Sequence, residues 1–193
     1  MDQNLQRNYF VRGTWIFSVL LAGIFLVPSA RAQPQEKAVS GRFLFVFDTS
    51  WAMRNRVDAV QKALKAMFAT SFSGQMHSGD SIGVWTFDQE LQTRVYPLET
   101  WEPDSAVMIA TNLVNFVGTR HYSGTARFES LQPWLNLVVT NSERLTVLIF
   151  CDGSVKAAGT TFDAGINEVF QEKQNEQYKA HQPFIIVLRS QLG

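Results

Sequence analysis

The feature that most constrains the fold is an uninterrupted apolar run at residues 43–47 that ends in the carboxylate of Asp48. An apolar run of this length, preceded by Gly41 and followed by polar residues, predicts a parallel strand that is buried on both faces. In open α/β sheets, ligands bind at the carboxyl ends of such strands. A buried carboxylate is costly unless it is hydrogen-bonded, paired or close to a metal. Asp48 therefore needs a partner, and Ser50 supplies an oxygen two residues later.

Strand and helix patterns alternate along the chain. Apolar runs predict strands at residues 42–47, 82–87, 145–151 and 184–188, with a short strand at 91–96 that would pair antiparallel at an edge. Apolar residues at helical spacing predict helices at 54–70, 105–117, 126–139 and about 161–178, the third kinked or divided at Pro133. We therefore expect a doubly wound α/β fold: a mostly parallel sheet with one antiparallel edge strand and helices on both faces.

The first 32 residues have the pattern of a secretory signal peptide. Arg7 and Arg12 form a basic start, residues 15–27 are apolar, and Ala30-Arg31-Ala32 is the small-x-small pattern of a cleavage site. The apolar stretch is shorter than the ~20 residues that a membrane span needs. We expect cleavage after Ala32, and an uncleaved N-terminal anchor is the alternative.

Cleavage would give an exported protein that is periplasmic, secreted or associated with the cell envelope. The rest of the chain divides into a polar linker at residues 33–41 and one domain at residues 42–193. This length is sufficient for a domain with a substantial core.

The charge balance argues against two classes of partner. The whole chain has 17 basic and 17 acidic residues, and the first 32 residues hold three of the basic and one of the acidic ones, so the remainder has a net charge of −2. This balance gives no electrostatic basis for binding nucleic acid or anionic lipid. We expect neither as a partner, unless the N-terminal segment is an uncleaved membrane anchor. The single cysteine, Cys151, excludes an intrachain disulfide and is expected to be a buried, inert thiol.

Further polar groups are expected to converge on Asp48. Asp152 follows the strand predicted at 145–151, and Thr125 precedes the helix predicted at 126–139. If the first and fourth strands flank the reversal of strand order, two carboxylates and the hydroxyls of Ser50 and Thr125 meet at one edge. Oxygen donors of this kind suit Mg²⁺. A divalent cation also removes the repulsion between two neighbouring carboxylates.

These motifs resemble those of von Willebrand factor type A (VWFA) domains. Asp48-Thr49-Ser50-Trp51-Ala52 is similar to the Asp-x-Ser-x-Ser loop of that family, and residues 79–87 resemble its second-strand motif. Ser123-Gly124-Thr125 is similar to its threonine loop, and Phe150-Cys151-Asp152-Gly153 to its fourth-strand Asp-Gly. The four motifs occur in family order, and the resemblance covers roughly residues 42–188. It implies a Rossmann-like fold and a non-enzymatic module for adhesion or protein interaction.

The resemblance also implies a metal-ion-dependent adhesion site, or MIDAS. Ser50 and Thr125 would bind the metal directly, whereas Asp48 and Asp152 would act mainly through coordinated waters. The cofactor would be Mg²⁺, or Mn²⁺ or Ca²⁺, and the partner would be a protein ligand presenting an acidic side chain. Ala52 departs from the pattern, because it stands where the motif's second serine would be a direct ligand. The loss of this hydroxyl should weaken metal binding, with water as the substitute.

A metal-free site is the alternative. In that hypothesis Asp48 only caps the first helix and Asp152 only caps a turn, and the chain is a structural interaction domain with a degenerate site.

The end of the sequence is a second departure from the family. The sequence stops at Gly193, just after the last predicted strand, whereas the family usually adds a sixth strand and a closing helix. Either the sequence is a C-terminally truncated fragment, or the edge after this strand is exposed and finds a partner.

A remote alternative is a serine esterase. Residues 79–83 match the Gly-x-Ser-x-Gly pattern, with Ser81 as the nucleophile. A nucleophile elbow follows a strand and opens a helix, whereas this block follows a polar loop and leads into a strand. We therefore expect no enzymatic activity.

Overall fold

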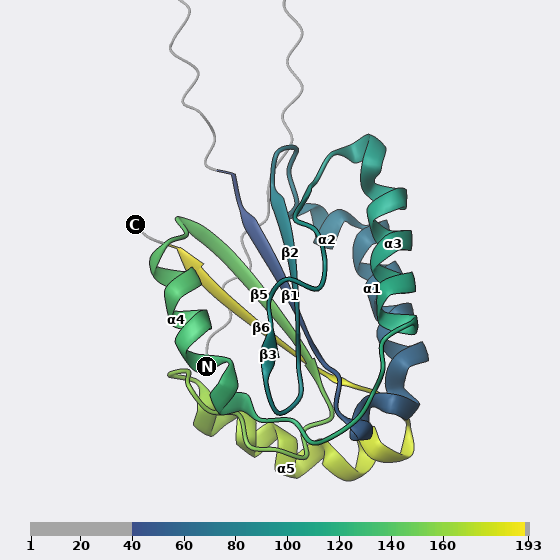
Figure 1. The fold of residues 1–193 in the computed structure, drawn as a ribbon, viewed down its shortest axis with the longest axis vertical. Helices are drawn as coiled ribbons and strands as arrows, with labels where there is room; N and C mark the ends of the chain where they lie inside the picture. The colour runs from purple at the N-terminus through teal and green to yellow at the C-terminus, as the bar shows by residue number, and fades with distance from the viewer. Residues whose placement is uncertain (1–39, 192–193) are drawn as a thin grey trace, which may run out of the picture. The chain divides into compact units, whose positions relative to one another are not determined.

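The computed structural model describes residues 40–191, which form an open, mixed sheet of six strands with helices on both faces (Figure 1). The strand order is β3-β2-β1-β5-β6, and β4 pairs with β2 outside this path. The strands are β1 Arg42–Asp48, β2 Ser81–Phe87, β3 Leu91–Gln92, β4 Glu99–Thr100, β5 Arg144–Cys151 and β6 Phe184–Gln191. The predicted α/β class is confirmed.

The centre of the sheet is parallel and buried on both sides. β1 pairs in parallel with β2 on one side and with β5 on the other. Every residue of β1 after Arg42 is buried, as the uninterrupted apolar run predicts for a central strand.

The helices form two layers that receive alternate side chains of β1. The longer ones are α1 Val57–Ala69, α3 Ala106–Gly118, α4 Gln132–Thr140 and α5 Asp163–Lys179; the shorter ones are η1 Trp51–Arg56, α2 Ser71–Gly74, η2 Pro103–Ser105 and η3 Phe128–Ser130. On one face, α1 and α3 pack over Phe43, Phe45 and Phe47. On the other face, α4 and part of α5 pack over Leu44 and Val46.

The helix predicted at 126–139 is divided, as its proline suggests. η3 and α4 are separate pieces, and Pro133 lies in the first turn of α4. Proline is tolerated there because the N–H that it lacks would have no partner within the helix.

Both edges of the sheet are antiparallel. The predicted edge strand at 91–96 is shorter than expected, since only β3 at Leu91–Gln92 pairs with β2. β6 also runs antiparallel to its neighbour β5, with Phe184 opposite Cys151. The chain therefore leaves the sheet at the end of β5 and re-enters it at the start of β6 on the same side, where the central strands have their carboxyl ends. In the segment between, residues 152–183, α5 lies beside these carboxyl ends (Figure 1). An apolar run predicts a strand but carries no information about its direction, so this feature could not be predicted.

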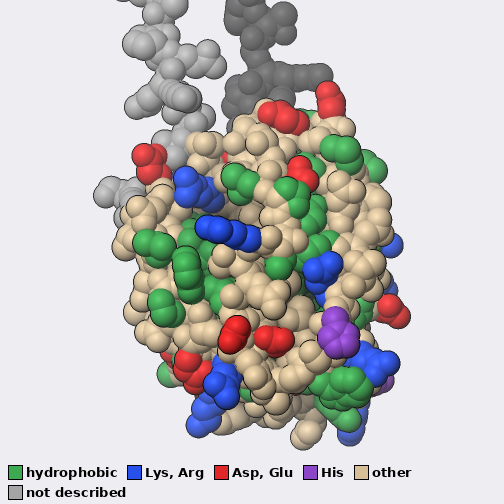
Figure 2. All heavy atoms as spheres, in the orientation of Figure 1, with side chains coloured by type: hydrophobic (Ala, Val, Ile, Leu, Met, Phe, Trp, Pro, Cys, Tyr) green, Lys and Arg blue, Asp and Glu red, His purple; other side chains and the backbone are tan. Residues whose placement is uncertain are grey.

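Several predictions fall wholly or partly outside the described residues. The signal peptide at 1–32 lies outside them, as does the linker at 33–41 apart from Ser40 and Gly41. Within residues 40–191, no helix has both the length and the apolar character needed to cross a membrane. Figure 2 shows acidic and basic side chains interspersed over the face in view, without a field of one sign.

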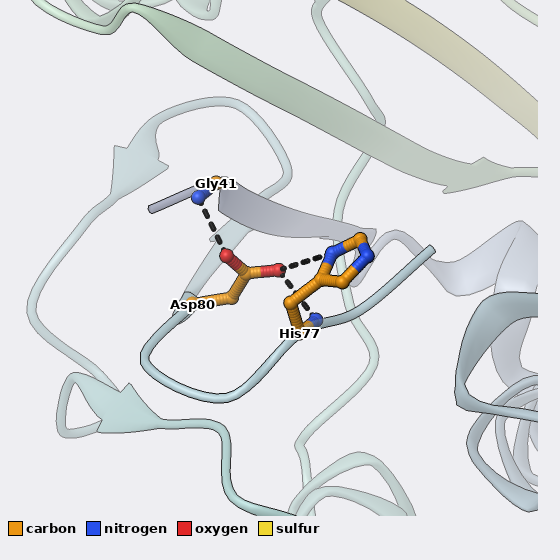
Figure 3. A network of polar contacts seen from close by, with 3 residues as sticks. All are labelled: Gly41, His77 and Asp80. Carbon is orange, nitrogen blue, oxygen red and sulfur yellow. Dashed lines mark hydrogen bonds and ion pairs between the residues drawn. The ribbon is translucent and has the colours of Figure 1, made fainter. Parts of the chain in front are cut away.

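A buried carboxylate fixes the start of β2 at the amino edge of the sheet. Asp80 accepts hydrogen bonds from the backbone N–H of Gly41 at 2.6 Å and of His77 at 2.8 Å (Figure 3). The Nδ1 atom of His77 lies 3.9 Å from the same carboxylate. Asp80 thus joins the turn before β2 to the residue before β1, which gives the Gly79-Asp80-Ser81 block a structural role at the start of a strand.

We expect Asp80→Ala to lower the free energy of unfolding by about 3 kcal/mol, because it removes the carboxylate that accepts two backbone N–H groups and leaves the buried Gly41 N–H unpaired. Urea denaturation at neutral pH measures the change. Asp104→Ala, at an exposed position, is the control and should change stability little. Equal stability of the two variants would contradict a structural role for Asp80.

Candidate metal site

Parallel pairing brings two carboxylates to neighbouring strand ends. Phe47 of β1 lies opposite Phe150 of β5, so Asp48 and Asp152 follow at the same edge of the sheet. Asp48 is 1% exposed and Asp152 is 6% exposed. Their proximity is also electrostatic, because the negative charge of Asp152 is among the causes that raise the pKa of Asp48.

The Asp48 carboxylate is only half satisfied. Its Oδ1 atom accepts a hydrogen bond of 2.7 Å from the backbone N–H of Ser50. Its Oδ2 atom is buried and has no hydrogen-bond partner among residues 40–191. The Oγ atom of Ser50 is likewise buried and makes no hydrogen bond of good geometry in this part of the chain, although it lies close enough to the Asp48 carboxylate to lower its pKa. Each unpartnered buried polar group costs about 1–3 kcal/mol, so the pair is a local defect unless something else binds both oxygens.

The loop that carries Thr125 lies against the loop that carries Ser50. The backbone N–H of Ser123 donates to the carbonyl of Thr49 at 2.9 Å, and that of Trp51 donates to the carbonyl of Gly124 at 3.1 Å. Gly124 has φ +67°, a left-handed conformation that favours glycine. These bonds hold residues 123–125 at the carboxyl edge. The side chain of Thr125 is exposed, however, whereas Asp48, Ser50 and Asp152 are buried.

Asp152 has local hydrogen-bond partners. Its Oδ1 atom accepts from the backbone N–H of Ser154 at 3.1 Å and from the Ser154 hydroxyl at 2.8 Å. Gly153, between them, has φ +72°, and a Cβ atom there would lie 2.5 Å from the ring of Phe184. Two structural features therefore explain Asp152 and Gly153: the turn around the Asp152 carboxylate, and the close packing of Gly153 against Phe184, the first residue of β6.

Burial is the main cause of the raised pKa values at this site. It raises the pKa of Asp48 to about 6, with Asp152 adding to the rise and hydrogen bonding by Ser50 opposing it. Burial also raises the pKa of the Cys151 thiol, which agrees with an inert cysteine. The pKa of Asp48 therefore lies not far below neutral pH, and a bound cation would favour the ionised form of its carboxylate.

Two further residues at this edge were missed by sequence reasoning. Burial raises the pKa of Tyr122 to about 12, and the Asp48 charge adds to the rise, which places this ring near the carboxylate. Its hydroxyl donates to the carbonyl of Val117 at 3.0 Å. Tyr122 directly precedes the Ser123-Gly124-Thr125 motif, and this adjacency was the only available signal.

Arg56 is the second missed residue. It is buried, donates from Nε to the carbonyl of Gln182 at 3.2 Å, donates from Nη1 to the carbonyl of Ala52, and lies 5.8 Å from the ring centroid of Tyr178. It thereby joins η1, which follows Ser50, to the end of α5. Its position on a helical pattern gave no indication of this contact.

Comparison with solved structures gives several distant likenesses. A solved von Willebrand factor type A protein from Catenulispora acidiphila is similar over 54% of this chain, with 18% sequence identity and a TM-score of 0.41. This chain covers 24% of that chain's length. No family model matches the sequence, and no curated protein matches it. A likeness this distant supports no conclusion about function.

The chemistry of the donor set is compatible with a hard cation. The unpartnered oxygens of Asp48 and Ser50 belong to a carboxylate and a hydroxyl, both of which are ligands for Mg²⁺ or Ca²⁺. In residues 40–191, no three His, Cys, Asp or Glu side chains are grouped so that they could hold a metal ion. A cation here would therefore need hydroxyl groups and water to complete its shell, which Mg²⁺ accepts because it usually keeps several waters.

We expect the stability of the metal-free protein to fall as the pH rises from about 4 to about 6. The raised pKa means that the folded state holds the Asp48 proton more tightly than the unfolded state, so this stabilisation is complete below the ordinary pKa of 3.8 and is lost as the pH passes 6. Asp48→Asn should remove this dependence and raise the free energy of unfolding at pH 7 in EDTA by about 2 kcal/mol.

Urea denaturation across this pH range measures both effects. Asp58→Asn, on the exposed side of α1, is the matched control and should follow the wild-type pH profile. If Asp48→Asn also follows it, Asp48 is not a carboxyl group with a raised pKa.

Proposed function

We propose that the chain is a non-enzymatic protein-interaction module that holds a Mg²⁺-type cation at the carboxyl edge of its sheet. The observation that carries this proposal is the pair of unpartnered buried oxygens on Asp48 and Ser50, beside the second carboxylate of Asp152. A cation bound there would satisfy both oxygens and offset the repulsion between the carboxylates.

The roles of the four side chains follow from their surroundings. Ser50 and Thr125 would supply hydroxyl ligands, and the carboxylates of Asp48 and Asp152 would balance the charge, mainly through water. The bound cation would supply an open coordination position for an acidic side chain of a protein partner. The exposure of Thr125 supports this arrangement, because a hydroxyl ligand that is open to solvent would leave the cation accessible to a partner.

The surface around the site is suited to contact with such a partner. Trp51 is 61% exposed, and its backbone is tied to the Thr125 loop through Gly124. The guanidinium of Arg54 lies 4.7 Å from the centroid of the Trp51 ring. An exposed tryptophan beside an arginine combines the residue types that contribute most to protein interfaces. These two side chains would form the rim that meets an acidic segment of the partner.

A metal-free interaction domain is the second candidate, and one observation favours it. Each carboxylate already accepts a hydrogen bond from the residue two positions later, Asp48 from Ser50 and Asp152 from Ser154. These are the bonds expected of carboxylates that only stabilise turns. This candidate leaves the second oxygen of Asp48 and the Ser50 hydroxyl without a role.

An esterase function has less support. Ser81 is the first residue of β2, and its backbone N–H donates to the carbonyl of Gly41 at the amino edge of the sheet. It lies at the opposite end of β1 from Asp48 and at the start of a strand, whereas a nucleophile elbow follows the end of a strand.

We expect saturating Mg²⁺ to raise the melting temperature by several degrees relative to EDTA, because a ligand at a hundred times its dissociation constant adds about 2.7 kcal/mol. Asp48→Ala should abolish this rise while the fold survives, and Asp58→Ala should retain it. Thermal melts of the three proteins, with and without Mg²⁺, measure the effect. A wild-type melting temperature that does not respond to Mg²⁺, Mn²⁺ or Ca²⁺ would support the metal-free candidate instead.

Restoring the missing serine provides a gain-of-function test. Ala52→Ser should lower the dissociation constant for Mg²⁺ by about tenfold, because a third hydroxyl would replace a water in the coordination shell. Ala59→Ser, a similarly half-buried position on α1, is the control and should leave it unchanged. Titration with Mg²⁺, followed by the thermal shift, measures both variants. Unchanged affinity in Ala52→Ser would show that position 52 does not face the ion.

A further inference from the structure

Two arginine side chains near the proposed cation site are stacked on aromatic rings. The guanidinium of Arg54 lies 4.7 Å from the centroid of the Trp51 ring, and that of Arg120 lies 4.3 Å from the centroid of the Phe116 ring. Neither arginine forms an ion pair with an Asp or Glu side chain in residues 40–191. Within this range, both positive charges therefore remain available to carboxylates of a partner.

The two arginines lie on the two segments that form the site. Arg54 is in η1, which directly follows Ser50. Arg120 lies between the end of α3 and the loop that carries Thr125. This loop is bonded to the Ser50 loop, because the backbone N–H of Trp51 donates to the carbonyl of Gly124 at 3.1 Å. One arginine therefore belongs to each side of the pair of loops.

The turn after α3 fixes the position of Arg120. The backbone N–H of Arg120 and the hydroxyl of Tyr122 both donate to the carbonyl of Val117, at 3.3 and 3.0 Å. Burial raises the pKa of Tyr122 to about 12, the Asp48 charge adds to the rise, and the Arg120 charge opposes it. The hydroxyl of Tyr122 therefore lies near both charged groups, which agrees with a place for Arg120 at the border of the site.

The outer nitrogens of both guanidinium groups are open to a ligand. Arg120 is half-buried, and among its nitrogens only Nε is a buried atom that lacks a hydrogen-bond partner in residues 40–191. Its Nη atoms are therefore the accessible end of the side chain. Arg54 is exposed. Stacking uses the face of a guanidinium and leaves its in-plane N–H donors free. A side chain that is already held by stacking also loses less rotamer freedom on binding.

We propose that Arg54 and Arg120 bind further carboxylates of the acidic partner, on either side of the carboxylate that would complete the shell of the cation. This inference rests on the proposed function and narrows its partner to a segment with several acidic residues. Two site carboxylates and one divalent cation balance in charge, so they alone give little attraction for additional acidic residues. The arginines supply that attraction, because a guanidinium fork binds a carboxylate through two parallel hydrogen bonds.

Fluorescence anisotropy with labelled decaglutamate tests the proposal. In Mg²⁺, the wild-type protein should bind decaglutamate at least about tenfold more tightly than a decapeptide of one glutamate and nine glutamines, because charge-assisted contacts add to the bond with the cation. Decaglutamate offers carboxylates at many spacings, including those of alternate residues, which point to the same side of an extended segment.

Three double variants test the dependence on the arginines. Arg54→Gln/Arg120→Gln should lose the preference for decaglutamate. Lys62→Gln/Lys65→Gln removes the same charge from the exposed side of α1 and should keep it. Arg54→Lys/Arg120→Lys keeps the charge without the fork and should show an intermediate preference, which also covers the case in which the first variant does not fold.

The proposal is overturned if the wild-type protein binds neither peptide or binds both equally, if the preference survives in Arg54→Gln/Arg120→Gln, or if the lysine control loses it to the same extent. Repeating the titrations in EDTA separates this result from the test of the proposed function. Binding that needs Mg²⁺ but shows no preference would overturn the arginine contacts and leave the cation site standing. A preference that depends on the arginines and is equal in EDTA and Mg²⁺ would support these contacts and contradict the cation site.

Discussion

The burial of one carboxylate at the end of the central strand constrains the rest of this structure. β1 is buried on both faces because helices cover both sides of it, so the residue that ends it is also withdrawn from water. That residue is Asp48, and Asp152 directly follows the neighbouring strand β5. Parallel pairing does not allow the two carboxylates to separate, because the register of β1 and β5 fixes where each strand ends. Burial is the main cause of the raised pKa of Asp48, and the charge of Asp152 adds to it.

The central strands and the layers of the fold were predictable because their signals are local and strong. The apolar run before Asp48 required burial on both faces, and the helical spacing around Leu64 and Leu113 required a buried face on each helix. The direction of β6 was not predictable, because the same apolar run would serve a parallel or an antiparallel strand. The site was predictable to the level of strand ends and loops. The exposure of Thr125 and the contact of Arg56 with Gln182 depend on how loops pack, which spacing along the chain does not encode.

The antiparallel return of β6 has a consequence for the carboxyl edge. Since residues 152–183 begin and end beside the same strand end, α5 remains beside the residues that follow β1 and β5. Arg56, the last residue of η1, connects it with the end of α5 through the backbone carbonyl of Gln182 and the ring of Tyr178. The loop that carries Ser50 is therefore held from two directions, by the Thr125 loop and by α5. A preorganised loop loses less conformational entropy when it binds a ligand.

Parallel pairing brings the residues at the ends of neighbouring strands together, whatever their charge. Strands that run in parallel align their first residues at one edge and their last residues at the other. At the carboxyl edge this alignment gathers Asp48 and Asp152. The two carboxylates repel each other, so their proximity does not by itself stabilise them. A cation is the simplest ligand that such an arrangement favours. Because the two carboxylates are buried and few, a cation there would share them with water.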